Sequence, residues 1–126
     1  MNKIVMDLDE TISSKVADKG YEDALPKMDV IEKMKSFQDI GFSICIFTAR
    51  NMRTYEGNIG KINANTLPVI LDWLARHDVP YDEIIVGKPW CGHDGFYVDD
   101  RAIRPSEFVE LSPEEIAERL AQEAHT

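Results

Sequence analysis

The stretch Lys3–Ile12 reads KIVMDLDETI, an apolar run that ends in two aspartates two residues apart. Side chains i and i+2 of a strand point to the same face, so Asp7 and Asp9 are expected to project together from a strand end. Two ionised carboxylates about 4 Å apart repel by roughly 4 kcal/mol at an effective dielectric constant of 20. The pattern therefore predicts a site that holds a positive charge beside this pair.

Length and composition fit one globular domain that spans residues 1–126. The 126 residues are 44% hydrophobic, enough to bury a sizeable core. The chain has 23 acidic and 14 basic residues, a net charge of −9, and its Lys and Arg are scattered. Nucleic acid and anionic membranes are bound through clustered positive charge, so we expect neither as a partner.

The chain shows neither a signal peptide nor an apolar run of membrane-spanning length, which favours a cytoplasmic protein. Its two cysteines form no disulfide framework. Cys45 lies within an apolar run, where a buried thiol is expected. Cys91 and His93 have no second pair at zinc-like spacing, so we do not interpret them as a metal site.

Beyond the first strand, short apolar runs alternate with helical patterns. Strands are expected at 42–47, 84–86, 96–98 and 108–109, and helices start at Asp29, Thr66 and Ser112, each with a capping residue. The polar segment 13–27 is expected to be a flap, and 51–66 a long loop. Alternating strands and helices pair in parallel, so we expect a single α/β domain: an open, mostly parallel, Rossmann-like sheet with helices on both faces.

Polar side chains stand where the apolar runs end. They are Asp7 and Asp9, Thr48, Lys88, and the pair Asp99 and Asp100. Any one of them could be a cap or a turn residue. Ligands bind at the carboxyl ends of parallel strands, so the whole series is better explained by one site at that edge.

This series resembles the four motifs of the haloacid dehalogenase superfamily of phosphohydrolases. The matches are DLDET at 7–11, Thr48, Lys88, and Asp99 with Asp100, which together cover nearly the whole chain. More narrowly, VGKPW at 86–90 and FYVDDR at 96–101 are similar to small capsular polysaccharide biosynthesis phosphatases. The resemblance implies a HAD-like fold and a Mg²⁺-dependent phosphatase that acts on a phosphate monoester, such as a sugar phosphate of capsule biosynthesis.

The residue types suit that chemistry. We expect Asp7 to be the nucleophile that forms an aspartyl-phosphate, and Asp9 to protonate the leaving oxygen and later activate water. Lys88 and Thr48 are expected to stabilise the transferred phosphoryl group. Mg²⁺ prefers oxygen ligands, which Asp7, Asp99 and the backbone carbonyl of Asp9 can supply, with Asp100 ordering a bound water.

The chain has no room for the cap domain that many superfamily members carry. The flap and the 51–66 loop are then left to shape the pocket, with Arg50, Arg53 and Lys61 as the expected substrate-binding residues and Trp90 and Arg104 as further candidates. Each of these five has the alternative of a solvated or ion-paired side chain. Only Pro89–Gly95 is available to carry the chain from Lys88 to a strand at Phe96, so this linker would be taut.

Other functions stay open at this point. A receiver-type signalling domain gathers similar residues, but its phosphoacceptor aspartate should end a middle strand. A phosphatase of nucleotides or polynucleotide ends would use the same chemistry, although the charge of −9 disfavours polynucleotides. A phosphotransferase, a mutase or a catalytically idle binding protein also fits the motifs, and a second subunit could cover an uncapped site.

Overall fold

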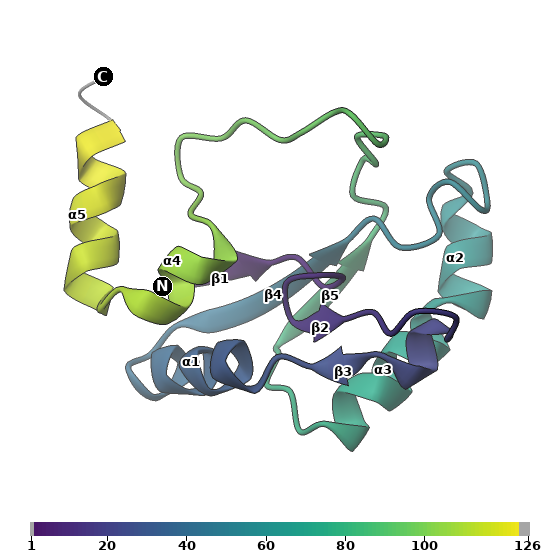
Figure 1. The fold of residues 1–126 in the computed structure, drawn as a ribbon, viewed down its shortest axis with the longest axis horizontal. Helices are drawn as coiled ribbons and strands as arrows, with labels where there is room; N and C mark the ends of the chain where they lie inside the picture. Colours follow the sequence, from purple (N-terminus) through teal and green to yellow (C-terminus); the bar gives the residue numbers. More distant parts are fainter. Residues whose placement is uncertain (1, 124–126) are drawn as a thin grey trace. The chain divides into compact units, whose positions relative to one another are not determined.

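The computed structural model describes residues 2–123, which form helices and strands joined by irregular segments (Figure 1). Contacts along the chain divide it after Trp90 into two compact units. The expectation of one domain over residues 1–126 therefore stays a prediction.

The first unit contains a three-stranded parallel sheet. Its strands are β1 (Lys3–Met6), β4 (Ser43–Thr48) and β5 (Glu83–Val86), in the order β1-β4-β5. Met6 lies opposite Ile46, and Thr48 opposite Val86, so the carboxyl ends of all three strands meet at one edge. The expected strands at the start of the chain, 42–47 and 84–86 are confirmed, as is the α/β class.

Three helices accompany this sheet: α1 (Met28–Asp39), α2 (Ile59–Asn65) and α3 (Leu67–Arg76). Helix α1 buries Val30, Ile31, Met34 and Phe37, the apolar stripe that the sequence predicts. The expected N-cap is wrong by two positions. Lys27 is the capping residue, and Asp29 sits in the first turn, where its Oδ1 accepts from the backbone N–H of Val30 at 2.8 Å.

The segment 51–66 is only partly a loop, so that prediction is corrected. Turns continue as far as Gly57, and α2 then occupies Ile59–Asn65. Asn58 caps this helix, because its side chain accepts from the backbone N–H of Lys61 at 3.1 Å. The asparagines that suggested a loop therefore include the residue that starts the helix.

The expected flap is a small two-stranded excursion. Strands β2 (Ser13–Ser14) and β3 (Leu25–Pro26) pair antiparallel, and the short 3₁₀ helix η1 (Tyr21–Asp23) lies between them. Two side chains of α3 hold it: Trp73 Nε1 donates to the Ala24 carbonyl at 2.9 Å, and Arg76 Nη2 to the Glu22 carbonyl at 2.8 Å. The flap is thus fastened to a helix at its tip.

The second unit contains helices α4 (Pro105–Glu110) and α5 (Pro113–Glu123). The start of α5 is as expected, because Ser112 Oγ accepts from the Glu115 N–H and the Glu115 carboxylate from the Ser112 N–H. The strand predicted at 108–109 is wrong. Phe108 and Val109 lie in α4, where Pro105 occupies the first turn and Glu107 accepts from the Arg104 N–H, so the helix start overrides their strand propensity.

The strand predicted at 96–98 is also wrong. Residues 96–98 are irregular, and Phe96 and Val98 are among the most exposed apolar side chains described. A strand is defined by its hydrogen-bonded partner, and a three-residue apolar run supplies none of its own. Figure 1 shows this part of the chain as an unpaired trace.

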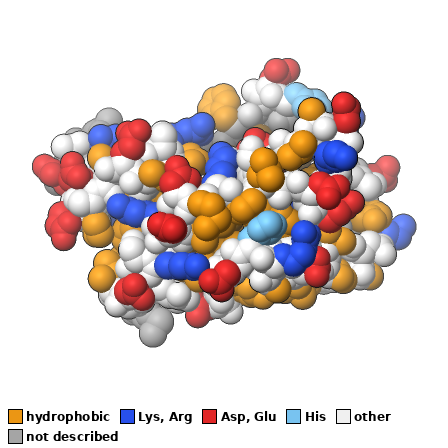
Figure 2. Space-filling view, turned by 60° about the horizontal axis from the view of Figure 1, so that its bottom comes forward, with side chains coloured by type: hydrophobic (Ala, Val, Ile, Leu, Met, Phe, Trp, Pro, Cys, Tyr) orange, Lys and Arg blue, Asp and Glu red, His pale blue; other side chains and the backbone are white. Residues whose placement is uncertain are grey.

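Charges of both signs are mixed on the face shown in Figure 2, where basic side chains lie among acidic ones. That view agrees with the scattered Lys and Arg of the sequence. Each helix described within residues 2–123 is too short or too polar to span a membrane.

Candidate active site

Asp7 follows the last residue of β1, and its carboxylate has an ammonium group and a hydroxyl as neighbours. Lys88 Nζ lies 3.7 Å from its Oδ1, and the Thr11 hydroxyl donates to its Oδ2 at 3.0 Å. The Asp7 side chain keeps 38% of its surface accessible. The two flanking residues, Met6 and Leu8, are buried, so the alternation of the strand turns Asp7 away from the core.

Lys88 comes from the far side of the sheet. It follows β5, and its backbone N–H donates to the Thr48 carbonyl at 3.1 Å, which ties it to the end of β4. Neighbouring strands are about 4.8 Å apart, so a side chain from β5 must span roughly 10 Å to reach β1. The long Lys88 side chain and the Asp7 side chain cover that distance together, and only 19% of the Lys88 side-chain surface remains accessible.

Asp9 is held by a different cation. Arg50, two residues beyond β4, donates from Nη2 to Asp9 Oδ1 at 2.7 Å and from Nε to Asp9 Oδ2 at 3.2 Å. This two-pronged geometry is the strong form of an arginine–carboxylate pair. Arg50 is 4% exposed, so the residue expected to contact substrate has a carboxylate as its immediate partner instead.

Tyr21 of the flap completes this arrangement. Its ring lies 4.1 Å from Arg50 Cζ, within range of a cation–π contact. Burial raises the pKa of Tyr21, the Asp9 carboxylate raises it further, and the Arg50 charge opposes both. The flap, the end of β4 and the segment after β1 therefore meet at Arg50.

Thr48 organises the site through its backbone and its hydroxyl. The side chain is buried, and Oγ1 accepts from the Arg50 N–H at 3.1 Å, while its carbonyl accepts from Lys88. Thr48 thus positions the two residues that hold the carboxylates. Its expected hydrogen bond to a phosphoryl group stays a prediction.

The other expected substrate-binding residues lie along the turns and helix after β4. The Arg53 guanidinium lies 5.5 Å from the ring of Trp90, and both residues are exposed. Lys61 is exposed in the first turn of α2. Asn51, which has φ of 62°, accepts from the Thr66 hydroxyl at 2.6 Å and thereby joins the start of this segment to the start of α3.

The remaining expected residues belong to the second unit. Asp99 and Asp100 are exposed, and Asp99 Oδ1 accepts from the Arg101 N–H at 2.7 Å. Arg104 caps α4. The metal-binding roles of Asp99 and Asp100 and a substrate contact of Arg104 stay predictions from the sequence.

The donor set at the β1 end suits a hard cation. Asp7 offers carboxylate oxygens and Asp9 its backbone carbonyl; Mg²⁺ prefers oxygen ligands and needs only one or two carboxylates beside water and substrate. Within residues 2–123, no cluster of three or more His, Cys, Asp or Glu side chains is close enough to hold a metal. The described residues therefore fit Mg²⁺ by chemical type, with a sparse set of protein ligands.

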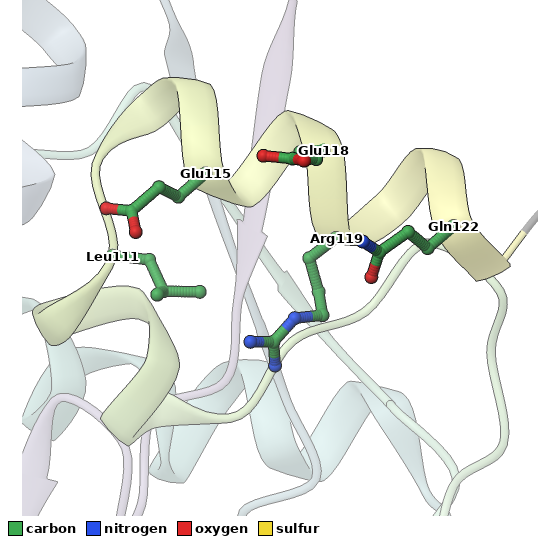
Figure 3. Close-up of a pocket in the computed structure, with 5 residues that line it drawn as sticks. All are labelled: Leu111, Glu115, Glu118, Arg119 and Gln122. Atoms are coloured by element: carbon green, nitrogen blue, oxygen red, sulfur yellow. The ribbon is translucent and has the colours of Figure 1, made fainter.

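A separate hollow lies in the second unit (Figure 3). Its volume is about 180 Å³, and it is lined by Leu111, Glu115, Glu118, Arg119 and Gln122. Glu115 accepts from the Ser112 N–H, and Arg119 pairs with Glu107, so its charged groups serve the ends of α4 and α5. This hollow lacks the convergent groups of a reaction site.

Tyr21 and Thr11 are the site residues to which sequence reasoning assigned no role. Thr11 stands inside the DLDET stretch, so its position four residues after Asp7 was available as a signal. Tyr21 had no such signal, because its contact with Arg50 joins residues 29 positions apart across the flap.

Comparison with known proteins identifies a solved structure that is similar to nearly the whole chain. No family model and no curated protein matches the chain. A crystal structure of a protein from Vibrio cholerae is similar over 98% of this chain and 99% of that one, with 57% sequence identity and a TM-score of 0.93. Its description states no activity, so the function of this chain is inferred from its residues. This chain belongs to the same family as that Vibrio cholerae protein.

Proposed function

We propose that this protein is a Mg²⁺-dependent phosphohydrolase that cleaves a phosphate monoester through an aspartyl-phosphate on Asp7. The observation that carries the proposal is the environment of Asp7: a half-exposed carboxylate at a strand end, with Lys88 Nζ 3.7 Å from one oxygen and the Thr11 hydroxyl 3.0 Å from the other. A nucleophilic carboxylate must be reachable and ionised, and a nearby cation attracts the anionic phosphate.

The reaction divides into two displacements at phosphorus. An oxygen of Asp7 attacks and forms a new O–P bond, while the bond to the leaving oxygen breaks and that oxygen takes a proton. Water then attacks the aspartyl-phosphate, which releases inorganic phosphate and restores the Asp7 carboxylate. Asp9, two residues away, is the proposed proton carrier in both steps.

Lys88 and Thr48 have supporting roles in this proposal. Lys88 lies close enough to Asp7 to neutralise charge on a phosphoryl group attached there. Thr48 holds the Lys88 backbone through its carbonyl. When bound, Mg²⁺ would supply positive charge that offsets the charge of the phosphoryl oxygens. Asp7 and the Asp9 carbonyl would hold it, with Asp99 as a further ligand and Asp100 ordering a bound water, both proposed from the sequence.

The substrate that we propose is a sugar phosphate. The exposed Arg53 and Trp90 are both in the first unit, after β4 and β5 respectively, and their stacked pair presents a cation and an aromatic ring together. Aromatic rings and arginine suit the apolar faces and hydroxyls of a sugar. The family resemblance to capsular polysaccharide phosphatases points to the same substrate class, and the protein is proposed to act in the cytoplasm, away from nucleic acid and membranes.

The first test is an assay of purified protein on p-nitrophenyl phosphate and a panel of sugar phosphates, with and without Mg²⁺. We expect Mg²⁺-dependent release of phosphate that is lost in Asp7→Asn and lost reversibly with EDTA. Nucleotides and polynucleotide 3′-phosphates in the same panel test the competing substrate classes. Full activity in Asp7→Asn would refute the role of Asp7, and no turnover of any phosphate ester by wild type would refute the function.

A further inference from the structure

Both the backbone and the guanidinium of Arg50 are held by neighbouring residues. Its backbone N–H donates to Thr48 Oγ1 at 3.1 Å, its guanidinium holds both oxygens of Asp9, and the Tyr21 ring covers it at 4.1 Å. Only 1% of the side-chain surface is accessible. These contacts come from three separate parts of the first unit and fix the guanidinium in one orientation.

Burying the Arg50 guanidinium carries a cost in fold stability. Among the residues that the structure describes, Arg50 Nη1 is buried and has no hydrogen-bond partner. An unsatisfied buried donor destabilises the folded state, and well-packed apolar residues often replace a whole buried ion pair without loss of stability. Fold stability is therefore a poor explanation for an arginine at this position, whereas orientation of Asp9 accounts for the two nitrogens that are used.

We propose that Arg50 is a positioning residue for Asp9, which it aims at the Asp7 reaction centre while Tyr21 of the flap locks its guanidinium in place. A carboxylate has about four lone-pair sites, and the two bonds from Arg50 occupy one site on each oxygen. Arg50 leaves the second lone-pair site on each Asp9 oxygen unused, and these sites can exchange a proton with the leaving group or with water. This inference rests on the proposed phosphohydrolase function.

The flap gains a role from the same geometry. Trp73 and Arg76 of α3 hold the carbonyls of Ala24, directly after η1, and of Glu22, within it, so Tyr21 is presented from a fixed support. A rigid second layer of contacts is what keeps a catalytic group in its productive geometry. Tyr21 thus supports the orientation of Asp9 through Arg50.

The main test replaces Arg50 by an apolar side chain of similar length. In Arg50→Met, kcat should fall about 100-fold, the loss typical of a misplaced catalytic group, while KM for p-nitrophenyl phosphate stays within about twofold. The melting temperature should fall only slightly, because the Asp9 carboxylate that loses its partner keeps 34% of its side-chain surface accessible to water. Tyr21→Leu should lower kcat by up to about 30-fold, the factor that corresponds to a lost cation–π contact at a desolvated site.

Arg119→Met is the matched control, because it removes an arginine from an ion pair with Glu107 in the second unit. It should leave kcat and KM unchanged. In Arg50→Ala, added guanidinium ion should restore part of kcat by occupying the vacated space, and it should restore nothing in Asp9→Asn. Wild-type kcat in Arg50→Met, or a KM effect without a kcat effect, would overturn the inference.

A readout without turnover covers the case in which Arg50→Met fails to fold. In ¹⁵N NMR spectra of wild type, the Arg50 Nε–H should exchange slowly with water, and this protection should disappear in Asp9→Ala. Protection that persists in Asp9→Ala would show that Asp9 is not its partner, against the inference. Inactive wild-type protein refutes the proposed function, whereas active wild type with an equally active Arg50→Met refutes only the positioning role.

Discussion

Gly87 immediately precedes Lys88, and its replacement by alanine should disturb the site in a measurable way. Its φ is +89°, a region that costs an L-residue about 1–2 kcal/mol. A Cβ atom there would lie 2.6 Å from Ile59 Cδ1, far inside contact distance. Ile59 is 43% exposed, so the end of its side chain can move at small cost, and backbone strain accounts for most of the loss.

Gly57→Ala is the matched control for that strain. Gly57 has φ of +77°, and its added Cβ would meet only Met52 Cε, at an ordinary 3.9 Å. Both variants should therefore lose about 1–2 kcal/mol of unfolding free energy in urea titrations. Only Gly87→Ala should also shift Lys88 relative to Asp7, and we expect its kcat on p-nitrophenyl phosphate to fall about tenfold or more.

The Ile59 contact can be tested separately. Ile59→Val removes the Cδ1 atom that the new methyl group would meet, so it should recover part of the activity of Gly87→Ala. The backbone strain would remain, so stability should recover little. Equal stability losses in the two glycine variants together with an unchanged kcat in Gly87→Ala would refute the link between this turn and Lys88.

Three further predictions concern the flap and the substrate. Trp73→Phe removes the 2.9 Å hydrogen bond to the Ala24 carbonyl. The free energy of unfolding should fall by about 1–2 kcal/mol, and proteolytic cleavage within residues 13–27 should become faster. The control Leu71→Ala keeps Trp73 and its hydrogen bond, so the flap should stay protected. Tyr21 should ionise above its ordinary pKa of 10.0, because burial and the Asp9 carboxylate raise that pKa. The contribution of protonated Tyr21 to fold stability is complete below pH 10.0 and is lost as the pH rises through the pKa of Tyr21 in the folded protein. Absorbance titration against Tyr21→Phe measures this, and ionisation at or below pH 10.0 would contradict it. Arg53→Ala and Lys61→Ala should raise KM for the preferred sugar phosphate far more than they lower kcat, and an unchanged KM across the panel would argue against their contact with substrate.

Much of the first unit was predictable because local patterns decide it. The apolar run before Asp7 forms β1, the stripe from Val30 to Phe37 becomes the buried face of α1, and Lys88 lies within 3.7 Å of Asp7 as parallel pairing implies. These features follow from the two periodicities of strand and helix and from the common edge of parallel strands. Pairing of Asp7 with a lysine 81 positions away was accessible by that reasoning.

The remaining features depend on tertiary contacts or on competing local rules. Phe108 and Val109 favour strands, but Pro105 and Glu107 start a helix around them. Phe96–Val98 looks like a strand in sequence, yet strand formation depends on a partner that the pattern cannot supply. The Asp9–Arg50–Tyr21 contacts require the flap to fold back over the end of β4, and no sequence spacing encodes that fold-back.

The most direct test of the account is to look for phosphate attached to Asp7. Wild-type protein mixed with Mg²⁺ and a substrate that it turns over should be quenched in acid, which preserves aspartyl-phosphates, and mapped by mass spectrometry. We predict a phosphorylated peptide that contains Asp7, absent from Asp7→Asn and present at higher occupancy when Asp9→Asn slows hydrolysis. Turnover of the same substrate with no phosphate on Asp7, or with phosphate on another residue, would contradict the central claim.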